Sequence, residues 1–301
     1  MKKLIIHLLP LALSATALCA DSDGPPPPPE KSAMKTTQVI LPLDATAPRP
    51  TIEAVINGQG PFLFILDTGA QGFVINADLA RELDLPVIGT AAMGDPSDPQ
   101  AIAVDRVRIE SVDIGGVSLS GVVADSWDQP EAFKAHLKGR GVFGVQMLAA
   151  FLVTFDYPES QIVIENGTLA QIDSDDIIPW RAVDDGLHTV PLQIGDLSFD
   201  AHIDSGSPSQ ITLPENVRDK LAYIDEPVVV GRGRTVNSEF EVWAGTLDGT
   251  VNLGALSMEK PKLHFVPMLN STGYANIGSS FLRDFVITFD HKSGLVRFRS
   301  G

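Results

Sequence analysis

Short apolar runs, many of them alternating with polar residues, recur along the chain from about residue 38 to its end. Gly, Pro, Asn or Asp bounds each run, which is the pattern of β-strands joined by turns. The clearest runs are TIEAVING (51–58), FLFIL (62–66), DRVRIESVDIGG (105–116), FLVTFDY (151–157) and FVITFDH (285–291). Helical signals are few, and the best are ADLAREL (77–83) and PENVRDKL (214–221). The pattern predicts an all-β protein with one short helix in each half.

The second half of the chain repeats the first. The matched segments are residues 57–76 with 194–213 and residues 144–164 with 278–298. Both matches keep the same order along the chain, which indicates a duplicated unit rather than unrelated strands of similar composition. The sequence therefore predicts two β-rich units, at residues 38–172 and 173–301, with the boundary near a polar Asp-Ser-Asp-Asp segment.

The N-terminal end has a different pattern. Two lysines precede an apolar stretch at residues 4–18, and small residues follow it, which is typical of an export signal. A retained membrane anchor is the alternative, but the stretch is short for a span, and no other segment is apolar enough to cross a bilayer. We expect a signal peptide at residues 1–20 and, at 21–37, a linker extended by five consecutive prolines. Residues 1–35 are expected to lie outside the fold.

Charge and cysteine usage narrow the partners and the location. The net charge of −16 and the pI of about 4.6 argue against nucleic acid and against an anionic membrane surface as partners. The single cysteine, Cys19, lies at the edge of the signal, so the fold has no disulfide and no thiol nucleophile. Lipidation of Cys19 is a minor alternative, because Leu18 stands where a bacterial lipoprotein signal has a small residue. We expect an exported protein, periplasmic or secreted.

Each repeat carries an acidic triplet at the same place, Asp67-Thr68-Gly69 and Asp204-Ser205-Gly206. Either triplet alone could be a tight turn. Two related units packed about a twofold axis would set the carboxyl groups face to face, where they would share one proton. The ionised member can then take a proton from water, and the protonated member can hydrogen-bond a scissile carbonyl. The glycines let the backbone approach closely, and the two hydroxyls can tie each loop to its neighbour.

On these triplets, the chain resembles the aspartic proteases and looks like two retropepsin-like units fused in one chain, the bilobal pepsin-like fold of two β-barrel lobes. The resemblance covers nearly everything from residue 38 to 301. It implies catalytic roles for Asp67 and Asp204. The implied supporting residues are Thr68, Gly69, Ser205, Gly206, Gly144 and Gly278. The expected activity is hydrolysis of peptide bonds in a peptide or protein substrate by a water that the two acids activate, in a monomer without metal or cofactor.

The second repeat departs from the family pattern at two positions. The segment that supports the acid loop reads Asn276-Ile277-Gly278, with Asn where an apolar residue is usual, whereas the first repeat has Val142-Phe143-Gly144. His202 replaces an aliphatic residue two positions before Asp204. Side chains two apart on a strand share a face, so His202 is expected near Asp204, where it would modulate the pH dependence. A bystander role at the strand's end is the alternative.

Two loops rich in Gly, Pro or charged residues, 89–105 and 230–240, are candidates for the flaps that cover the cleft in this family. The first has no tyrosine, which pepsin-type flaps carry. No zinc, EF-hand or serine-hydrolase motif is present. The competing function is a non-catalytic peptide-binding protein on the same scaffold, because fold alone does not separate the two. Two buried acids favour the enzyme.

Overall fold

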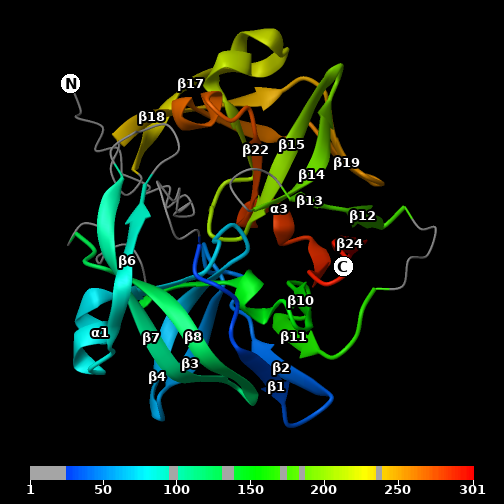
Figure 1. Cartoon of the computed structure of the whole chain (residues 1–301). Helices are drawn as coiled ribbons and strands as arrows, with labels where there is room; N and C mark the ends of the chain where they lie inside the picture. The colour runs from blue at the N-terminus through cyan, green and yellow to red at the C-terminus, as the bar shows by residue number, and fades with distance from the viewer. Residues whose placement is uncertain (1–24, 95–100, 131–138, 170–174, 183–186, 235–238) are drawn as a thin grey trace.

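The computed structural model describes residues 25–94, 101–130, 139–169, 175–182, 187–234 and 239–301. Within these ranges the chain is built of strands and turns with few helices, arranged as two lobes with a shared sheet between them (Figure 1). The predicted all-β, two-lobed fold is confirmed. The predicted signal peptide with Cys19, and the predicted boundary at residue 173, lie outside the described residues.

The first lobe is a closed barrel. Its strands are β1 (Lys31–Met34), β3 (Thr51–Ile56), β4 (Gln59–Asp67), β5 (Phe73–Asn76), β6 (Val87–Met93), β7 (Ile102–Ile114), β8 (Val117–Trp127) and β9 (Gly141–Gly144). Neighbours pair in the order β8-β5-β9-β4-β3-β7, and a further pairing of β7 with β8 closes the ring of six strands. Alternate residues point inward, so Ile52, Ala54 and Ile56 of β3 are all buried.

The second lobe repeats the central part of this order. Its strands are β13 (Arg181–Ala182), β14 (His188–Ile194), β15 (Leu197–Asp204), β16 (Ile211–Pro214), β17 (Tyr223–Arg234), β18 (Glu239–Leu247), β19 (Thr250–Leu253), β20 (Leu256–Glu259), β21 (Lys262–Val266) and β22 (Ala275–Gly278). The path β16-β22-β15-β14 matches β5-β9-β4-β3 of the first lobe. The long strand β7 corresponds here to the two strands β18 and β19, and β8 corresponds to β20 and β21.

Both halves contribute three strands to the shared sheet. These are β2 (Gln38–Pro42), β10 (Leu152–Asp156), β11 (Gln161–Glu165), β12 (Ile177–Pro179), β23 (Phe285–Asp290) and β24 (Leu295–Ser300). At its centre β10 pairs antiparallel with β23, and Thr154 lies opposite Thr288 with their hydroxyl oxygens 2.9 Å apart. Because these two threonines occupy equivalent positions of the repeat, a pseudo-twofold axis passes between them.

The proline-rich segment takes part in the fold. Strand β1 pairs antiparallel with β8, Pro26 is buried, and Glu30 forms an ion pair with Arg108 at 3.0 Å. Pro26 lies so close to Gly72 that a Cβ on that glycine would be 2.9 Å from the proline Cδ. The expectation that this segment lies outside the fold is therefore wrong for Pro26 to Met34. The sequence pattern did not predict strand β1, because the strand is four residues long and half of its residues are exposed.

The described helices are short, and α3 (Ser279–Leu282) lies between the two lobes (Figure 1). Among the described residues, the α-helices are α1 (Ala77–Glu82) and α3, and 3₁₀ helices span Val145–Leu148, Glu215–Lys220 and Pro267–Asn270. The predicted helix at 77–83 is confirmed as α1, and the one predicted at 214–221 is a 3₁₀ helix. None of the helices within the described ranges is long and apolar enough to cross a membrane.

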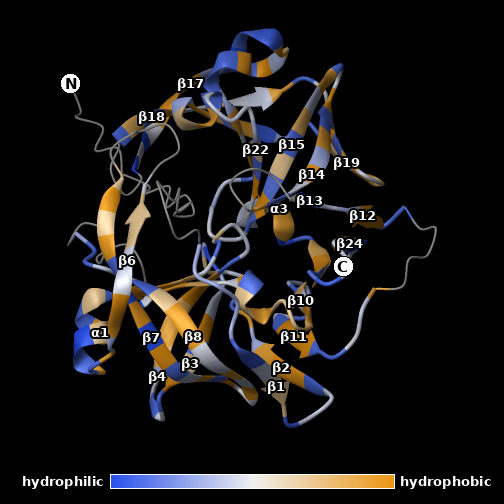
Figure 2. Ribbon diagram, in the orientation of Figure 1, coloured by the Kyte–Doolittle hydropathy of each residue, from blue (hydrophilic) through white to orange (hydrophobic). Residues whose placement is uncertain are grey.

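One cluster of buried apolar side chains runs through both lobes and the shared sheet. Figure 2 shows the apolar residues concentrated along the strands, with polar residues at the turns. The fully buried phenylalanines of this cluster are Phe64, Phe73, Phe143, Phe155, Phe265, Phe289 and Phe298. A core that is continuous across the lobes fixes their relative position, on which the geometry of any site between them depends.

Candidate active site

The two acidic residues end equivalent strands. Asp67 is the last residue of β4, which runs parallel to β9 with Asp67 opposite Gly144. Asp204 is the last residue of β15, which runs parallel to β22 with Asp204 opposite Gly278. In each lobe, therefore, an aspartate lies at the end of an apolar strand where a tight turn begins. A neighbouring strand that ends in glycine packs against this turn.

The hydroxyl residues of the two triplets exchange hydrogen bonds across the lobes. The backbone N–H of Thr68 donates to Ser205 Oγ at 3.1 Å, and the N–H of Ser205 donates to Thr68 Oγ1 at 2.9 Å. Each hydroxyl in turn donates to the opposite strand, Thr68 to Ile203 O at 2.6 Å and Ser205 to Leu66 O at 2.8 Å. This symmetric exchange marks a second point on the pseudo-twofold axis and ties the two turns together.

The two carboxyl groups are buried beside one another. Asp67 is 3% exposed and Asp204 is fully buried. Burial raises the pKa of Asp67 well above its usual range, and the adjacent Asp204 carboxyl raises it further, while the Gly69 N–H and Arg49 act in the opposite direction. Gly206 lies against Asp67, since a Cβ on that glycine would be 2.3 Å from Asp67 Oδ2. Two acids this close cannot both ionise easily.

Two further polar side chains reach this pair from outside the triplets. The side-chain amide of Asn276 donates to Asp204 Oδ2 at 2.5 Å. Arg49, from the loop before β3, donates through Nε to Gly206 O at 2.6 Å. Burial lowers the pKa of Arg49, and the charges of Asp204 and, to a lesser extent, Asp67 oppose that shift. A guanidinium stays protonated even so, which places a positive charge next to the two acids.

Sequence reasoning identified Asn276 as a departure from the family pattern but assigned it no contact, and it missed Arg49. The signal for Asn276 was a polar residue in an apolar strand that ends in a supporting glycine. Arg49 stands between two prolines just before the first strand of the repeat. Nothing in that local sequence predicts that the side chain turns inward to the second lobe's acid loop.

The supporting glycines lie against the backbone of the acid loops. A Cβ on Gly144 would be 2.5 Å from Ala70 O, and one on Gly278 would be 2.3 Å from Ser209 O. The amide of Gly144 also donates to Gly72 O at 2.9 Å, and that of Gly278 donates to Gln210 O at 2.8 Å. Each glycine thus allows a backbone contact that any side chain would block.

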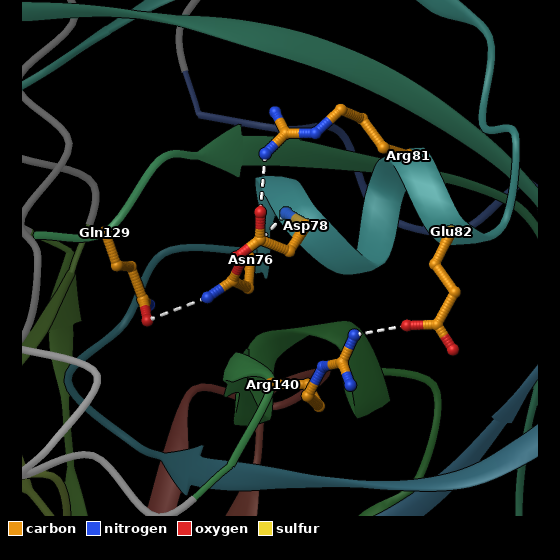
Figure 3. A network of polar contacts seen from close by, with 6 residues as sticks. All are labelled: Asn76, Asp78, Arg81, Glu82, Gln129 and Arg140. Carbon is orange, nitrogen blue, oxygen red and sulfur yellow. Dashed lines mark hydrogen bonds and ion pairs between the residues drawn. The ribbon is translucent and has the colours of Figure 1, made fainter. Parts of the chain in front are cut away.

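A network of polar contacts surrounds the start of α1 and the residue before β9 (Figure 3). The N–H of Asn76 donates to Arg140 O at 2.8 Å, and its amide nitrogen lies 3.4 Å from Gln129 Oε1. Arg140 also pairs with Glu82 of α1 at 2.6 Å. This pair is partly exposed and therefore adds little stability, but the backbone bond fixes the start of β9, which ends at Gly144.

His202 is buried on β15, two residues before Asp204. Its ring packs edge-on against Tyr274 at 5.1 Å, and Nδ1 lies 3.3 Å from His188 O. In the parallel pairing of β15 with β22, His202 stands opposite Asn276. The histidine therefore neighbours the residue that touches Asp204, and its effect on pH dependence stays a prediction.

The flap candidates form hairpins, one in each lobe. Residues 89–105 run from within β6 to within β7, and residues 230–240 run from within β17 to within β18. Both hairpins lie on the same side of the molecule (Figure 1). The tips, at residues 95–100 and 235–238, lie outside the described residues. Arg232 and Arg234 pair with Glu239 on the exposed surface at 3.5 and 3.1 Å.

Within the described part of the chain, no group of three or more His, Cys, Asp or Glu side chains is arranged to hold a metal ion. The two acids, with backbone and amide donors around them, form a set suited to proton transfer.

Comparison with known proteins agrees with this geometry. A family profile described as aspartyl protease matches residues 52–146, which include Asp67 and its supporting Gly144. No curated protein matches the chain. Residues 52–146 therefore match the retropepsin-like aspartyl proteases, and the barrel of the first lobe is compatible with this match.

Proposed function

We propose that this chain is an aspartic endopeptidase in which Asp67 and Asp204 act as one catalytic pair. The observation that carries the proposal is the exchange of hydrogen bonds between Thr68 and Ser205, which brings an acid from each lobe to one buried place. The family match covers only the unit around Asp67, so the role of Asp204 rests on this geometry.

The reaction needs one ionised and one protonated carboxyl. The ionised member takes a proton from a water molecule, which attacks the peptide carbonyl carbon, while the protonated member hydrogen-bonds the carbonyl oxygen. The C–N bond of the resulting tetrahedral intermediate breaks when the acid that took the proton from water passes it to the leaving amine nitrogen. Both acids are buried, so each proton transfer takes place away from bulk water, where electrostatic interactions are stronger.

The substrate is a peptide segment that lies between the two hairpins, β6–β7 and β17–β18. Since both acids belong to one chain, the monomer is the active form. We also propose that the protein acts after export, on the strength of its N-terminal sequence alone.

The test is cleavage of a mixed peptide library by the purified protein between pH 3 and 8, with and without a statine-type inhibitor. Asp67→Asn and Asp204→Asn are each expected to lower kcat/KM by about 10²–10⁴-fold, the usual contribution of a general acid or base. Near-normal turnover in either folded variant would disprove the two-carboxyl mechanism. Peptide binding without cleavage by the unaltered protein would instead support a binding protein on this scaffold.

A further inference from the structure

The two acids of the pair have unequal hydrogen-bond partners. Asp204 accepts bonds on both oxygens, on Oδ1 from the Ser207 N–H at 3.0 Å and on Oδ2 from the Asn276 amide at 2.5 Å. On Asp67 the described protein donor is the Gly69 N–H, which reaches Oδ1 at 2.7 Å. Its other oxygen, Oδ2, lies against Gly206 in the second lobe's acid loop. Donors stabilise the ionised form of a carboxyl, so this difference favours charge on Asp204.

The donor to Asp204 has an apolar counterpart in the first lobe. Asn276 stands two residues before Gly278, and Val142 stands two residues before Gly144. The strand pairings match as well, with His202 opposite Asn276 in one lobe and Ile65 opposite Val142 in the other. The two lobes can therefore be compared directly, because the same backbone position carries a hydrogen-bond donor to the acid in one lobe and a hydrocarbon side chain in the other.

The buried position of Asn276 makes this contact specific. Asn276 is 3% exposed. Because a buried amide without a hydrogen-bond partner is unfavourable, the Asn276 side chain stays hydrogen-bonded to Asp204. Among the described residues, the titratable and charged groups near Asp204 include Asp67 across the axis, Arg49 from the loop before β3, and His202 on its own strand. On the β16 side, Asn276 stands opposite Thr212, which is neutral.

Resting on the proposed function, we propose that Asn276 is a positioning residue that assigns the shared proton: it keeps Asp204 ionised as the general base, and Asp67 carries the proton as the general acid. Arg49 reinforces this arrangement through its positive charge beside the same loop. Asp67 then donates its proton toward Asp204 in the resting pair and toward the substrate carbonyl during the reaction.

The assignment predicts which limb of a pH profile each residue controls. The acidic limb marks protonation of the ionised acid, and the basic limb marks loss of the shared proton. Asn276 stabilises charge on Asp204 in the active state and in the doubly ionised state alike, so its removal moves the acidic limb and leaves the basic limb nearly unchanged. Loss of the Arg49 charge would raise both limbs, which distinguishes the two effects.

The experiment titrates the two acids directly and does not depend on turnover. In full-length protein labelled with ¹³C at the aspartate carboxyl carbon, NMR follows the pair from pH 2 to 9, with Asp67→Asn and Asp204→Asn to assign the signals. In Asn276→Val, which copies the first lobe, the lower titration of the pair is expected to rise by about one to two pH units, the equivalent of one lost hydrogen bond to a charged group. The acidic limb of kcat/KM should rise with it.

The matched control is Val142→Asn, which adds an amide beside Asp67 and should lower the upper titration instead. Asn276→Ala is the second variant if valine prevents folding. An unchanged lower titration in a folded Asn276 variant overturns the inference, and so does a titration that assigns the first ionisation to Asp67. If the unaltered protein cleaves no peptide but Asn276→Val still shifts the lower titration, the proposed function fails while the proton assignment stands.

Discussion

The loops around Asp67 and Asp204 share a backbone and differ in their side chains. Each loop follows a strand that runs parallel to a strand ending in glycine. Each loop also contributes a hydroxyl to the hydrogen bonds between Thr68 and Ser205 across the pseudo-twofold axis. Beyond the triplet the second loop carries Ser207, Ser209 and Thr212. The first loop has Ala70 in place of Ser207 and Val74 in place of Thr212, since Thr212 pairs with Asn276 and Val74 pairs with Val142. The second loop is therefore polar, and its three hydroxyls are linked in a chain at 2.8 Å each.

The first loop is covered differently. Gly72 leaves room for Pro26 of the proline-rich segment. Thus the duplicated backbone sets where the two acids meet, and residues outside the triplets set how each carboxyl is surrounded. Variants made in pairs, one in each lobe, separate the shared part from the part that differs.

The largest expected effect breaks the shared part. Gly144→Ala and Gly278→Ala each place a Cβ within 2.5 Å of a backbone carbonyl oxygen, although φ is −68° and −92°, which alanine adopts readily. The cost is thus a collision and not backbone strain, and each change should lower the free energy of unfolding by about 3 kcal/mol and abolish activity. Denaturant unfolding of both variants tests this, and a small loss at only one glycine would show that the lobes rely on this contact unequally.

A smaller loss is expected at the hydroxyl exchange. Ser205→Ala leaves the buried Leu66 carbonyl and Thr68 N–H without their partner, and Thr68→Ala does the same to Ile203 and Ser205. Each change should cost about 2 kcal/mol, with the larger loss for Ser205, which is fully buried. Thr68→Ser keeps the hydroxyl and serves as control. Equal stability of Thr68→Ala and Thr68→Ser would contradict the role given to this hydroxyl.

The sequence predicted this shared part well and the differing part poorly. The shared part consists of local sequence patterns, namely the repeated triplets, the two supporting glycines and the alternating strands. The duplication strengthens the prediction, because each pattern occurs once in each half of the chain. Arg49, the Asn276–Asp204 hydrogen bond and strand β1 depend on how distant segments meet. No periodic sequence pattern indicates where the side chain of Arg49 points, since it lies in a loop between two prolines. The same holds for the pairing of β1, which is short and partly exposed.

A pH-dependent stability difference separates the two acids. Because burial and the neighbouring Asp204 raise the pKa of Asp67, the folded state binds a proton that the unfolded chain releases above about pH 4. Stability contributed by this proton is fully present below that pH and is lost as the pH rises through the folded-state pKa. Asp67→Asn removes the loss, so it should be more stable than the unaltered protein by about 0.5–2 kcal/mol at pH 7 and equal to it near pH 3.5.

Asp204→Asn provides the comparison in thermal unfolding at pH 3.5 and pH 7. It replaces the acceptor of the Asn276 amide, so no gain in stability at neutral pH is expected. Equal behaviour of the two variants would mean that the carboxyl groups are equivalent in the folded protein despite their different partners.

The smallest expected effect concerns His202. Residues paired across neighbouring strands point to the same face, so His202, Asn276 and Asp204 share one face of the sheet. A protonated imidazole there would favour the ionised pair, and His202→Leu should therefore raise the acidic limb of kcat/KM, by less than about one pH unit. The shift should be smaller than that of Asn276→Val, because the histidine ring is also held against Tyr274 and the His188 carbonyl. Profiles from pH 3 to 8 that superimpose with those of the unaltered protein would make His202 a bystander and leave Asn276 and Arg49 as the residues that distinguish the two acids.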